Sequence, residues 1–200
     1  MNPPVDEPRA DASTEPSDAM LLASVASGDR VSLSTLVRRH WASLFRYMRR
    51  MTGDEATAED ALQDTFVAVL EHAGTFRGEG SARAWLYALA RNALRRRVRR
   101  RIGEPSPADV SEDVESLGAN AGFGCVGSWS RALEDREEIE RALDTLSDDD
   151  REVLAWVDAE GLSIDEAAAL LGLGEAALKS RLHRARLRFM AAMRAMGGEA

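Results

Sequence analysis

The sequence is poor in cysteine and contains no long apolar run. Cys125 is the single cysteine among 200 residues, so an internal disulfide is impossible, which fits a reducing compartment. A bilayer-spanning helix needs about 20 apolar residues in a row, and no such stretch occurs. The first residues lack the basic and then apolar pattern of a secretion signal. We therefore expect a cytoplasmic protein without membrane insertion.

The patterns of metal, cofactor and catalytic sites are also missing. The three histidines are scattered, and Cys125 has no cysteine or histidine neighbour at a metal-site spacing. Three acids at 148–150 suggest a metal site, but acids in a first helical turn are favoured by the helix dipole, and no further ligand follows. No nucleophile, base and orienting group recur together. We expect no metal, no cofactor and no enzymatic activity. A nuclease that uses the clustered acids is the enzyme alternative.

Charge is distributed unevenly along the chain, whose formal charge is −8. Residues 21–103 hold 15 basic and 8 acidic side chains, whereas residues 131–200 hold 10 and 16. Between them, 104–130 has five acids, two prolines, four glycines and no base, which is typical of a linker. We predict a disordered tail over 1–17, a domain over 18–103, a flexible acidic linker over 104–130 and a second domain over 131–196.

Both domains are predicted to be helical, because neither contains a convincing alternation of period two. The first domain has three apolar stripes at helical spacing, and Gly53 lies where the first helix would stop. Their positions are Leu33, Leu36, Val37, His40, Trp41, Leu44, Phe45 and Met48; Leu62, Phe66, Val69 and Leu70; and Trp85, Leu86, Leu89, Ala90 and Ala93. In the second domain, Ser147 is predicted to cap a helix that contains Val153 and Trp156. The fold class is therefore all-α.

The C-terminal part of the chain has the pattern of a helix-turn-helix. Ser163 and Glu166 form a capping box for a short helix through Leu171, Gly172 ends it, and Gly174 lets a second helix start at an angle. Apolar positions on the two helices would then meet. They are Ala167, Leu170 and Leu171 on the first helix and Leu178, Leu182, Ala185 and Phe189 on the second.

The second helix of this unit has a polar and basic surface that suits DNA. Short, polar and cationic side chains near the start of such a helix match base edges in the major groove, and later arginines match phosphates. The candidate residues are Ala176, Lys179, Ser180, His183, Arg184 and Arg186. An amphipathic helix with a solvated basic face is the alternative, but the cap, the broken turn and the second stripe favour DNA.

Three segments resemble one protein family. They are "AEDALQDTFVAVLEH" (58–72), "TFRGEGSARAWLYALARN" (75–92) and "SDDDREVLAWVDAEGLSIDEAAALLGLGEAALKSRLHRARLRF" (147–189). Together they resemble the sigma-70-type transcription initiation factors of the extracytoplasmic-function (ECF) group, which retain sigma regions 2 and 4. The resemblance implies a region 2 helical bundle and a region 4 helix-turn-helix, which direct RNA polymerase to promoters.

The resemblance also implies roles for residues of the first domain. Asp60, Gln63 and Asp64 match the residues that bind the clamp coiled coil of the largest polymerase subunit. The loop 74–82 matches the one that captures a flipped base of the −10 element, where a polar pocket with a cationic rim is needed. The residues assigned to −10 DNA are Arg77, Trp85, Arg91, Asn92, Arg95, Arg96 and Arg99. Further implied partners are the flap of the second-largest subunit, −35 DNA and an anti-sigma factor.

The sequence departs from the family at two places, and one alternative function stays open. Arg95 and Arg96 stand where an aspartate is frequent, which predicts a different −10 preference. The recognition helix begins at Gly174 and Glu175 without the usual hydroxyls, which removes a phosphate contact and a cap. The alternative is a helix-turn-helix regulator that binds operator DNA without being a polymerase subunit.

Overall fold

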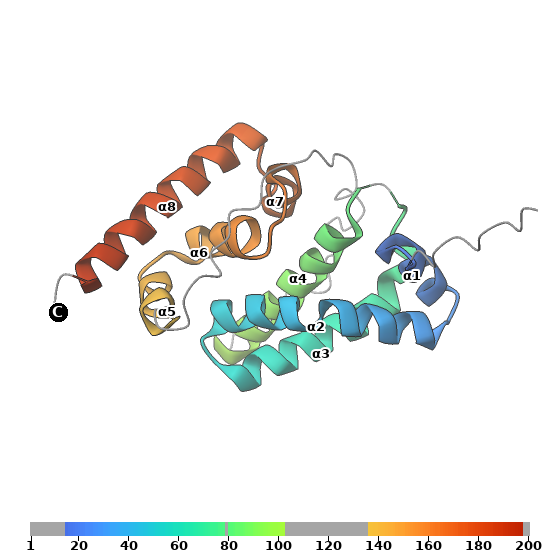
Figure 1. The fold of residues 1–200 in the computed structure, drawn as a ribbon. Helices are drawn as coiled ribbons and strands as arrows, with labels where there is room; N and C mark the ends of the chain where they lie inside the picture. The colour runs from blue at the N-terminus through green and yellow to red at the C-terminus, as the bar shows by residue number, and fades with distance from the viewer. Residues whose placement is uncertain (1–14, 79, 103–135, 198–200) are drawn as a thin grey trace, which may run out of the picture.

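The computed structural model describes residues 15–78, 80–102 and 136–197 (Figure 1). Every regular element within these residues is a helix, so the all-α prediction is confirmed. Most of the predicted tail over 1–17 and the whole predicted linker over 104–130 lie outside the described residues. The proposed domain boundaries therefore stay predictions.

The first domain consists of four α-helices and one short 3₁₀ turn. They are α1 (Asp18–Ala26), α2 (Arg30–Thr52), α3 (Glu55–His72), η1 (Ala73–Thr75) and α4 (Ala82–Ile102). The turn between α2 and α3 is tight because Gly53 ends α2 in the left-handed conformation, with φ 66°, and the side chain of Asp54 caps α3. α3 then packs against both α2 and α4.

The helix α1 has no counterpart among the three helices predicted for this domain. The side chain of Ser17 caps it, and it buries Leu21, Leu22 and Val25 in the core. Asp18 fixes it to α2, since its carboxylate lies 2.7 Å from Nε2 of His40. Burial lowers the pKa of His40, and the nearby Asp18 opposes that shift. Its nine residues are too few to give a clear periodic pattern.

The second domain contains four α-helices, one of which continues into a π-helical turn. They are α5 (Arg136–Asp144), α6 (Asp148–Leu154), the turn η4 (Ala155–Ala159), α7 (Ile164–Leu171) and α8 (Glu175–Gly197). Ser147 accepts a hydrogen bond from the backbone N–H of Asp150, so the predicted cap is confirmed. Val153 and Trp156 are fully buried, as their positions in the pattern predicted.

Most predicted stripe positions are buried, and two are exposed. Leu36, Leu44, Met48, Leu62, Val69, Leu86 and Ala90 are fully buried. Trp41 is 41% exposed and Leu70 is 52% exposed, so their placement on the core stripe was wrong. Both lie at the edge of their stripe, where a helical wheel does not separate core from surface. The ring of Trp41 stacks on Phe66 with a centroid distance of 6.2 Å.

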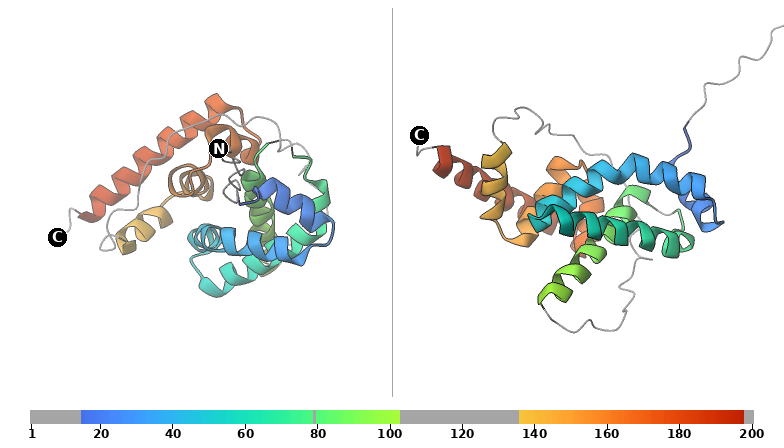
Figure 2. Two further views of the ribbon diagram at one scale, coloured as in Figure 1. Left: turned by 45° about the vertical axis from the view of Figure 1, so that its right-hand side comes forward. Right: turned by 90° about the horizontal axis from the view of Figure 1, so that it is seen from below.

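The two domains pack directly against each other. α7 lies against α4, while α6 and η4 lie against α2, as two further views show (Figure 2). The buried apolar residues of both domains belong to one contiguous core cluster. This contact was not predicted, because the linker composition of 104–130 indicated two separate domains.

Candidate nucleic-acid and polymerase interfaces

The helix-turn-helix is formed by α7 and α8. Ser163 Oγ accepts from the backbone N–H of Glu166 at 3.1 Å, and Glu166 Oε2 accepts from the backbone N–H of Ser163 at 2.7 Å. The capping box is therefore confirmed. Gly172 ends α7 in the left-handed conformation with φ 64°, a conformation that disfavours residues with a Cβ. The chain then turns, and α8 begins at Glu175.

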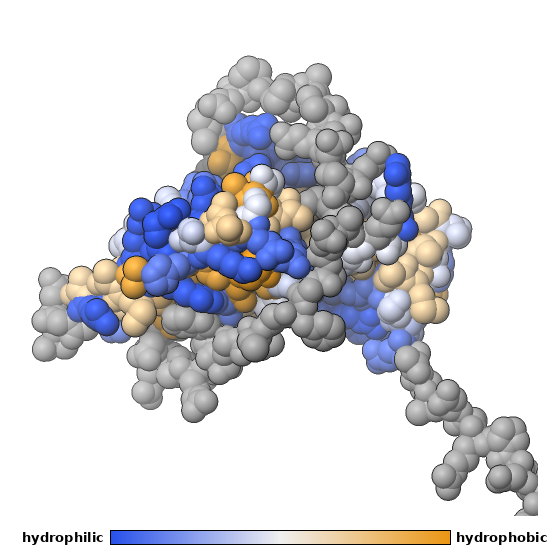
Figure 3. Space-filling view, turned by 90° about the horizontal axis from the view of Figure 1, so that it is seen from above, coloured by the Kyte–Doolittle hydropathy of each residue, from blue (hydrophilic) through white to orange (hydrophobic). Residues whose placement is uncertain are grey.

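One side of α8 is buried and the other carries the predicted DNA-binding residues. Leu178, Leu182, Ala185 and Phe189 are buried, which fixes the rotation of the helix about its axis. All six candidates for −35 DNA are exposed: Ala176, Lys179, Ser180, His183, Arg184 and Arg186. Seen from the α8 side, hydrophilic residues are interspersed with apolar ones on this face (Figure 3). The geometry thus brings these six side chains to one accessible helix surface.

Two cations of this surface are paired with acids of the same domain. Lys179 Nζ lies 2.9 Å from Glu175 Oε2, and Arg186 donates two hydrogen bonds to Asp158 at 3.0 and 2.5 Å. These hydrogen bonds raise the pKa of Lys179 and of Arg186. To bind Lys179 or Arg186, a DNA phosphate or base edge would have to displace Glu175 or Asp158. Within the described residues, Arg184 has no ion-pair partner, so its guanidinium is the cation here most available to a base edge or a phosphate.

The predicted −10 loop follows η1 and leads into α4. Phe76 of the loop packs against Trp85 of α4, with the ring centroids 5.8 Å apart. Trp85 is only 3% exposed, and its Nε1 has no hydrogen-bond partner among the described residues. Gly78 and Gly80 have φ of 75° and 94°. In this conformation the ring of Trp85 is buried against Phe76 and is not open to a base.

The arginines of α4 differ in their surroundings. Arg95 and Arg96 are exposed, whereas Arg91, Asn92 and Arg99 are half-buried. Within the described residues no ion pair is found for Arg95, Arg96 or Arg99, so these three can meet a DNA backbone. Arg91 is different, because its guanidinium lies 3.1 Å from Glu152 of the second domain and donates to the carbonyl of Leu170 at 2.5 Å.

The three predicted polymerase-binding residues lie on one side of α3. Asp60 and Gln63 are exposed, and Asp64 is half-buried. Both carboxylates contact Arg97 of α4, Asp64 at 2.7 Å and Asp60 at 2.6 Å. The hydrogen bond that Arg97 donates to Asp64 is the largest cause of a raised pKa of Arg97. Sequence reasoning missed Arg97 as the residue that positions this acidic surface, although it is one of the seven arginines in 91–101.

The described residues contain neither a candidate metal-ion cluster nor a helix able to span a membrane. Across 15–78, 80–102 and 136–197, no group of three or more histidine, cysteine, aspartate or glutamate side chains is placed to hold a metal ion. Asp149 and Asp150, two of the three consecutive acids, instead contact Arg181 and Arg188 of α8. None of the helices that the structure describes is both long and apolar enough to cross a membrane.

Comparison with known proteins identifies the family. The family model "Sigma-70 region 2" matches residues 36–102, and "Sigma-70, region 4" matches residues 136–189. The ECF RNA polymerase sigma factor SigM of Mycobacterium tuberculosis is 35% identical over 174 residues, which cover 87% of this chain and 83% of that protein. The chain belongs to the ECF sigma factors. An ECF sigma factor directs RNA polymerase to promoters and is not an enzyme.

Further relatives agree with this assignment over most of the chain. The sigma factor CnrH of Cupriavidus metallidurans is 34% identical over 184 residues, which cover 88% of this chain and 94% of that protein. The solved structure of CnrH in complex with the cytosolic domain of CnrY has a TM-score of 0.63, with 28% identity over 89% of this chain and 97% of that one. The structure of RpoE with the anti-sigma factor NepR from Bartonella quintana has a TM-score of 0.62, with 25% identity over 80% of this chain and 96% of that one.

Proposed function

We propose that this sigma factor reads the −35 element as duplex DNA through α8 and binds the melted −10 strand through the loop 74–82 and α4. The observation that carries this proposal is the orientation of α8. Its buried apolar side faces α7, and its exposed side presents Lys179, Ser180, His183 and Arg184. A recognition helix needs this division to enter a major groove.

The proposed −10 surface is the exposed end of α4. Arg95, Arg96 and Arg99 offer positive charge along a single helix, which suits the backbone of an unpaired strand. The loop 74–82 precedes this helix directly and would hold the extruded base. Two weakly binding domains on one chain gain from effective concentration, so neither domain has to bind promoter DNA tightly by itself.

The proposed contact with core polymerase is made by Asp60, Gln63 and Asp64. They occupy positions i, i+3 and i+4 of α3 and therefore share one face. The exposed apolar residues Val67 and Leu70 lie one and two turns further along the same helix. An acidic surface bordered by apolar side chains suits the clamp coiled coil of the largest subunit.

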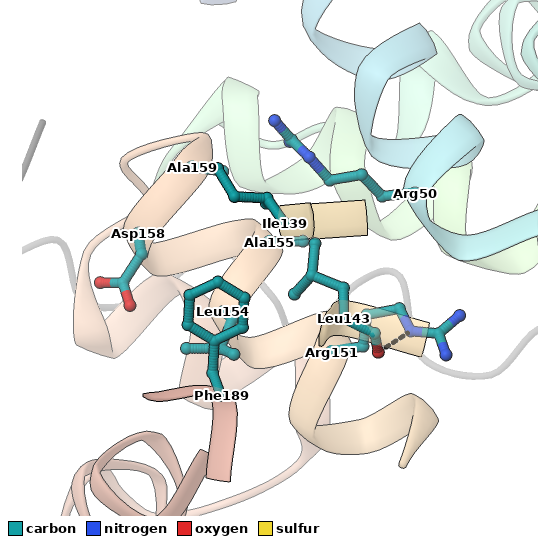
Figure 4. Close-up of a pocket in the computed structure, with 9 residues that line it drawn as sticks. All are labelled: Arg50, Ile139, Leu143, Arg151, Leu154, Ala155, Asp158, Ala159 and Phe189. Carbon is teal, nitrogen blue, oxygen red and sulfur yellow. Dashed lines mark hydrogen bonds between the residues drawn. The ribbon is translucent and has the colours of Figure 1, made fainter. Parts of the chain in front are cut away.

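A second polymerase contact is proposed at an apolar cavity of about 80 Å³ in the second domain. It is lined by apolar side chains of α5, α6 and α8, and Arg50 of α2 stands on its far side (Figure 4). The lining includes Ile139, Leu143, Leu154 and Phe189. The flap of the second-largest subunit would place an apolar side chain here, and Arg50 would have to move aside.

Regulation by an anti-sigma factor in the cytoplasm completes the proposal. CnrH and RpoE were each solved with such a partner or with its cytosolic domain. This chain resembles both over most of its length. An anti-sigma factor that covers α3 and the second domain would block the two polymerase contacts proposed above.

Substitution of Asp64 tests the polymerase contact. We expect Asp64→Ala to reduce co-purification with core polymerase and promoter-dependent transcription together, by about thirtyfold or more, since a charged contact at an interface centre is worth about 2 kcal/mol or more. Arg97→Ala is the matched control, because it removes the same intramolecular ion pair and leaves both carboxylates in place. Equal losses in the two variants would show that the pair is structural and would remove Asp64 from the interface. If the wild-type chain bound duplex operator DNA but never stimulated core polymerase, the alternative of a helix-turn-helix regulator that is not a polymerase subunit would be favoured.

A further inference from the structure

Two carboxylates of the second domain are buried against the first domain. Glu152 lies on α6 and Glu160 directly follows η4, and their side chains are 7% and 1% exposed. A buried carboxylate is costly unless charged or hydrogen-bonding partners surround it. Within the described residues, the side chains that contact the two carboxylates come from α2 and α4 of the first domain. The two carboxylates with these partners are called the carboxylate latch below.

Glu160 is held by four side chains of the first domain. Oε1 accepts from Arg50 at 2.9 Å, while Oε2 accepts from Tyr87 at 3.1 Å and lies 3.4 Å from Arg46. The guanidinium of Arg83 also donates to the backbone carbonyl of Glu160. These contacts join residues that are 73 to 114 positions apart in the sequence. They form one half of the carboxylate latch.

Glu152 forms the other half, at the base of the arginine-rich helix. It accepts from Tyr47 at 2.9 Å and from Nε of Arg91 at 3.1 Å. The guanidinium of Arg91 also lies over the ring of Trp156, 5.4 Å from its centroid. Arg91 therefore has a carboxylate, a carbonyl and an aromatic face around it, all supplied by the second domain.

We propose that the carboxylate latch holds the free sigma factor closed and that Glu152 occupies the place of a DNA phosphate on Arg91. A guanidinium binds carboxylate and phosphate with the same planar fork of N–H donors. The inference rests on the proposed function, because Arg91 belongs to the surface assigned to −10 DNA. While α7 and η4 cover Arg91, that part of the surface is closed to nucleic acid. Residues 21–103 carry a net positive charge and residues 131–200 a net negative one, and this attraction also favours the closed state.

The composition of the interface makes it reversible. The cost of removing two carboxylates from water offsets much of the gain from pairing them. Trp156 is fully buried, and its Nε1 has no hydrogen-bond partner among the described residues. Opening returns both carboxylates to water. A partner that binds the open chain therefore has only a modest difference in free energy to overcome.

The experiment compares the free wild-type chain with the double variant Glu152→Gln and Glu160→Gln. Small-angle X-ray scattering measures the radius of gyration, and fluorescence anisotropy measures binding to a single-stranded −10 oligonucleotide, both without polymerase. We expect the variant to be more extended. Its affinity for the oligonucleotide should rise by the inverse of the open fraction of the wild type, which is about tenfold if one molecule in ten is open.

The matched control removes two acids that pair within single domains. Glu55→Gln breaks the pair with Arg49 in the first domain, and Asp144→Asn breaks the pair with Arg151 in the second. The change in net charge equals that of the latch variant. The control should keep the wild-type radius and affinity. An increase in affinity of the same size in both variants would overturn the proposal, because it would reflect net charge alone.

A second variant attacks the latch from the first domain. Arg46→Gln with Arg50→Gln leaves the second domain unchanged, and both side chains are partly exposed, at 53% and 28%. This arginine variant should be as extended as the Glu152→Gln and Glu160→Gln variant. It therefore tests the latch even if the carboxylate variant fails to fold. A wild-type chain that is already extended, or latch variants that stay compact, would overturn the proposal.

The two proposals fail separately. Compact latch variants that still support promoter transcription with core polymerase would remove the latch and leave the proposed function intact. Variants that extend but never stimulate polymerase would keep the latch and contradict the proposed function.

Discussion

At the scale of single residues, the candidate DNA-binding cations differ in how much of their charge is available. Lys179 and Arg186 already have carboxylate partners within their own domain. Arg184 and Arg99 have no ion pair in the part of the chain that the structure describes. Exposed ion pairs contribute little to stability, so DNA can displace them, but each displacement reduces the net gain. The unpaired arginines should therefore dominate binding.

Substitutions of Arg184 and Arg99 should separate base reading from phosphate binding. In the reconstituted holoenzyme, Arg184→Ala should cost about 1 to 3 kcal/mol at the preferred −35 sequence and relax selectivity there. Arg99→Ala should weaken all sequences alike and lower the salt slope by about one unit. Binding titrations over a set of −35 variants at several salt concentrations measure both effects. Arg194→Ala, at the far end of α8, is the control. The same selectivity in Arg184→Ala as in wild type would contradict the assignment.

At the scale of elements, the turn between α7 and α8 depends on one glycine and not on its neighbour. Gly172 has φ 64°, whereas Gly174 lies outside the left-handed region and an added Cβ there meets nothing within 4 Å. The backbone N–H of Leu178 donates to the carbonyl of Gly174 at 3.0 Å, so Gly174 stands at the start of α8. A hydroxyl there would cap the helix.

A serine substituted in turn at each glycine tests this difference in backbone conformation. Gly172→Ser should lower the free energy of unfolding by about 1 to 2 kcal/mol, because a residue with a Cβ is strained in the left-handed conformation. Gly174→Ser should leave stability unchanged or increase it by a few tenths of a kcal/mol or more. Urea unfolding of the full chain measures both. Equal losses would mean that the turn is not set by the backbone of Gly172.

The elements were predictable where local signals agreed. Gly53, Ser147, the capping box at Ser163 and the break at Gly172 each use a short-range rule of backbone geometry or hydrogen bonding. The region 2 and region 4 signatures then supplied the order of the domains. α1 was missed because it is short, and the edge positions Trp41 and Leu70 were misplaced because periodicity alone does not define where a buried stripe ends.

At the scale of the whole molecule, the domain interface was not predictable from local patterns. Glu152 and Glu160 look like ordinary surface acids in the sequence, and their partners are 61 to 114 residues away. Only the tertiary structure brings them to Tyr47, Tyr87 and the arginines. The uneven charge of the two domains was visible, but it did not distinguish attraction between domains from attraction to nucleic acid.

The proposed closure would also limit nonspecific binding of nucleic acid by the arginine-rich helix of this acidic chain. The second domain supplies carboxylates to Arg91, and α3 supplies carboxylates to Arg97. Nonspecific binding to DNA scales with the number of phosphates neutralised. Engagement of these two arginines in the free chain should therefore lower nonspecific affinity until polymerase and promoter are both present.

Site-specific crosslinking in the reconstituted holoenzyme tests most directly whether the two domains contact different parts of the promoter. The second domain should contact duplex DNA, and the first domain should contact the melted strand. A photoreactive residue is placed in turn at the positions of Arg184 and Arg95, both exposed, in an open promoter complex. We expect crosslinks from position 184 to the −35 duplex and from position 95 to the non-template strand near −10. Crosslinks from both positions to the same duplex segment, or none from position 95 to the melted strand, would contradict it.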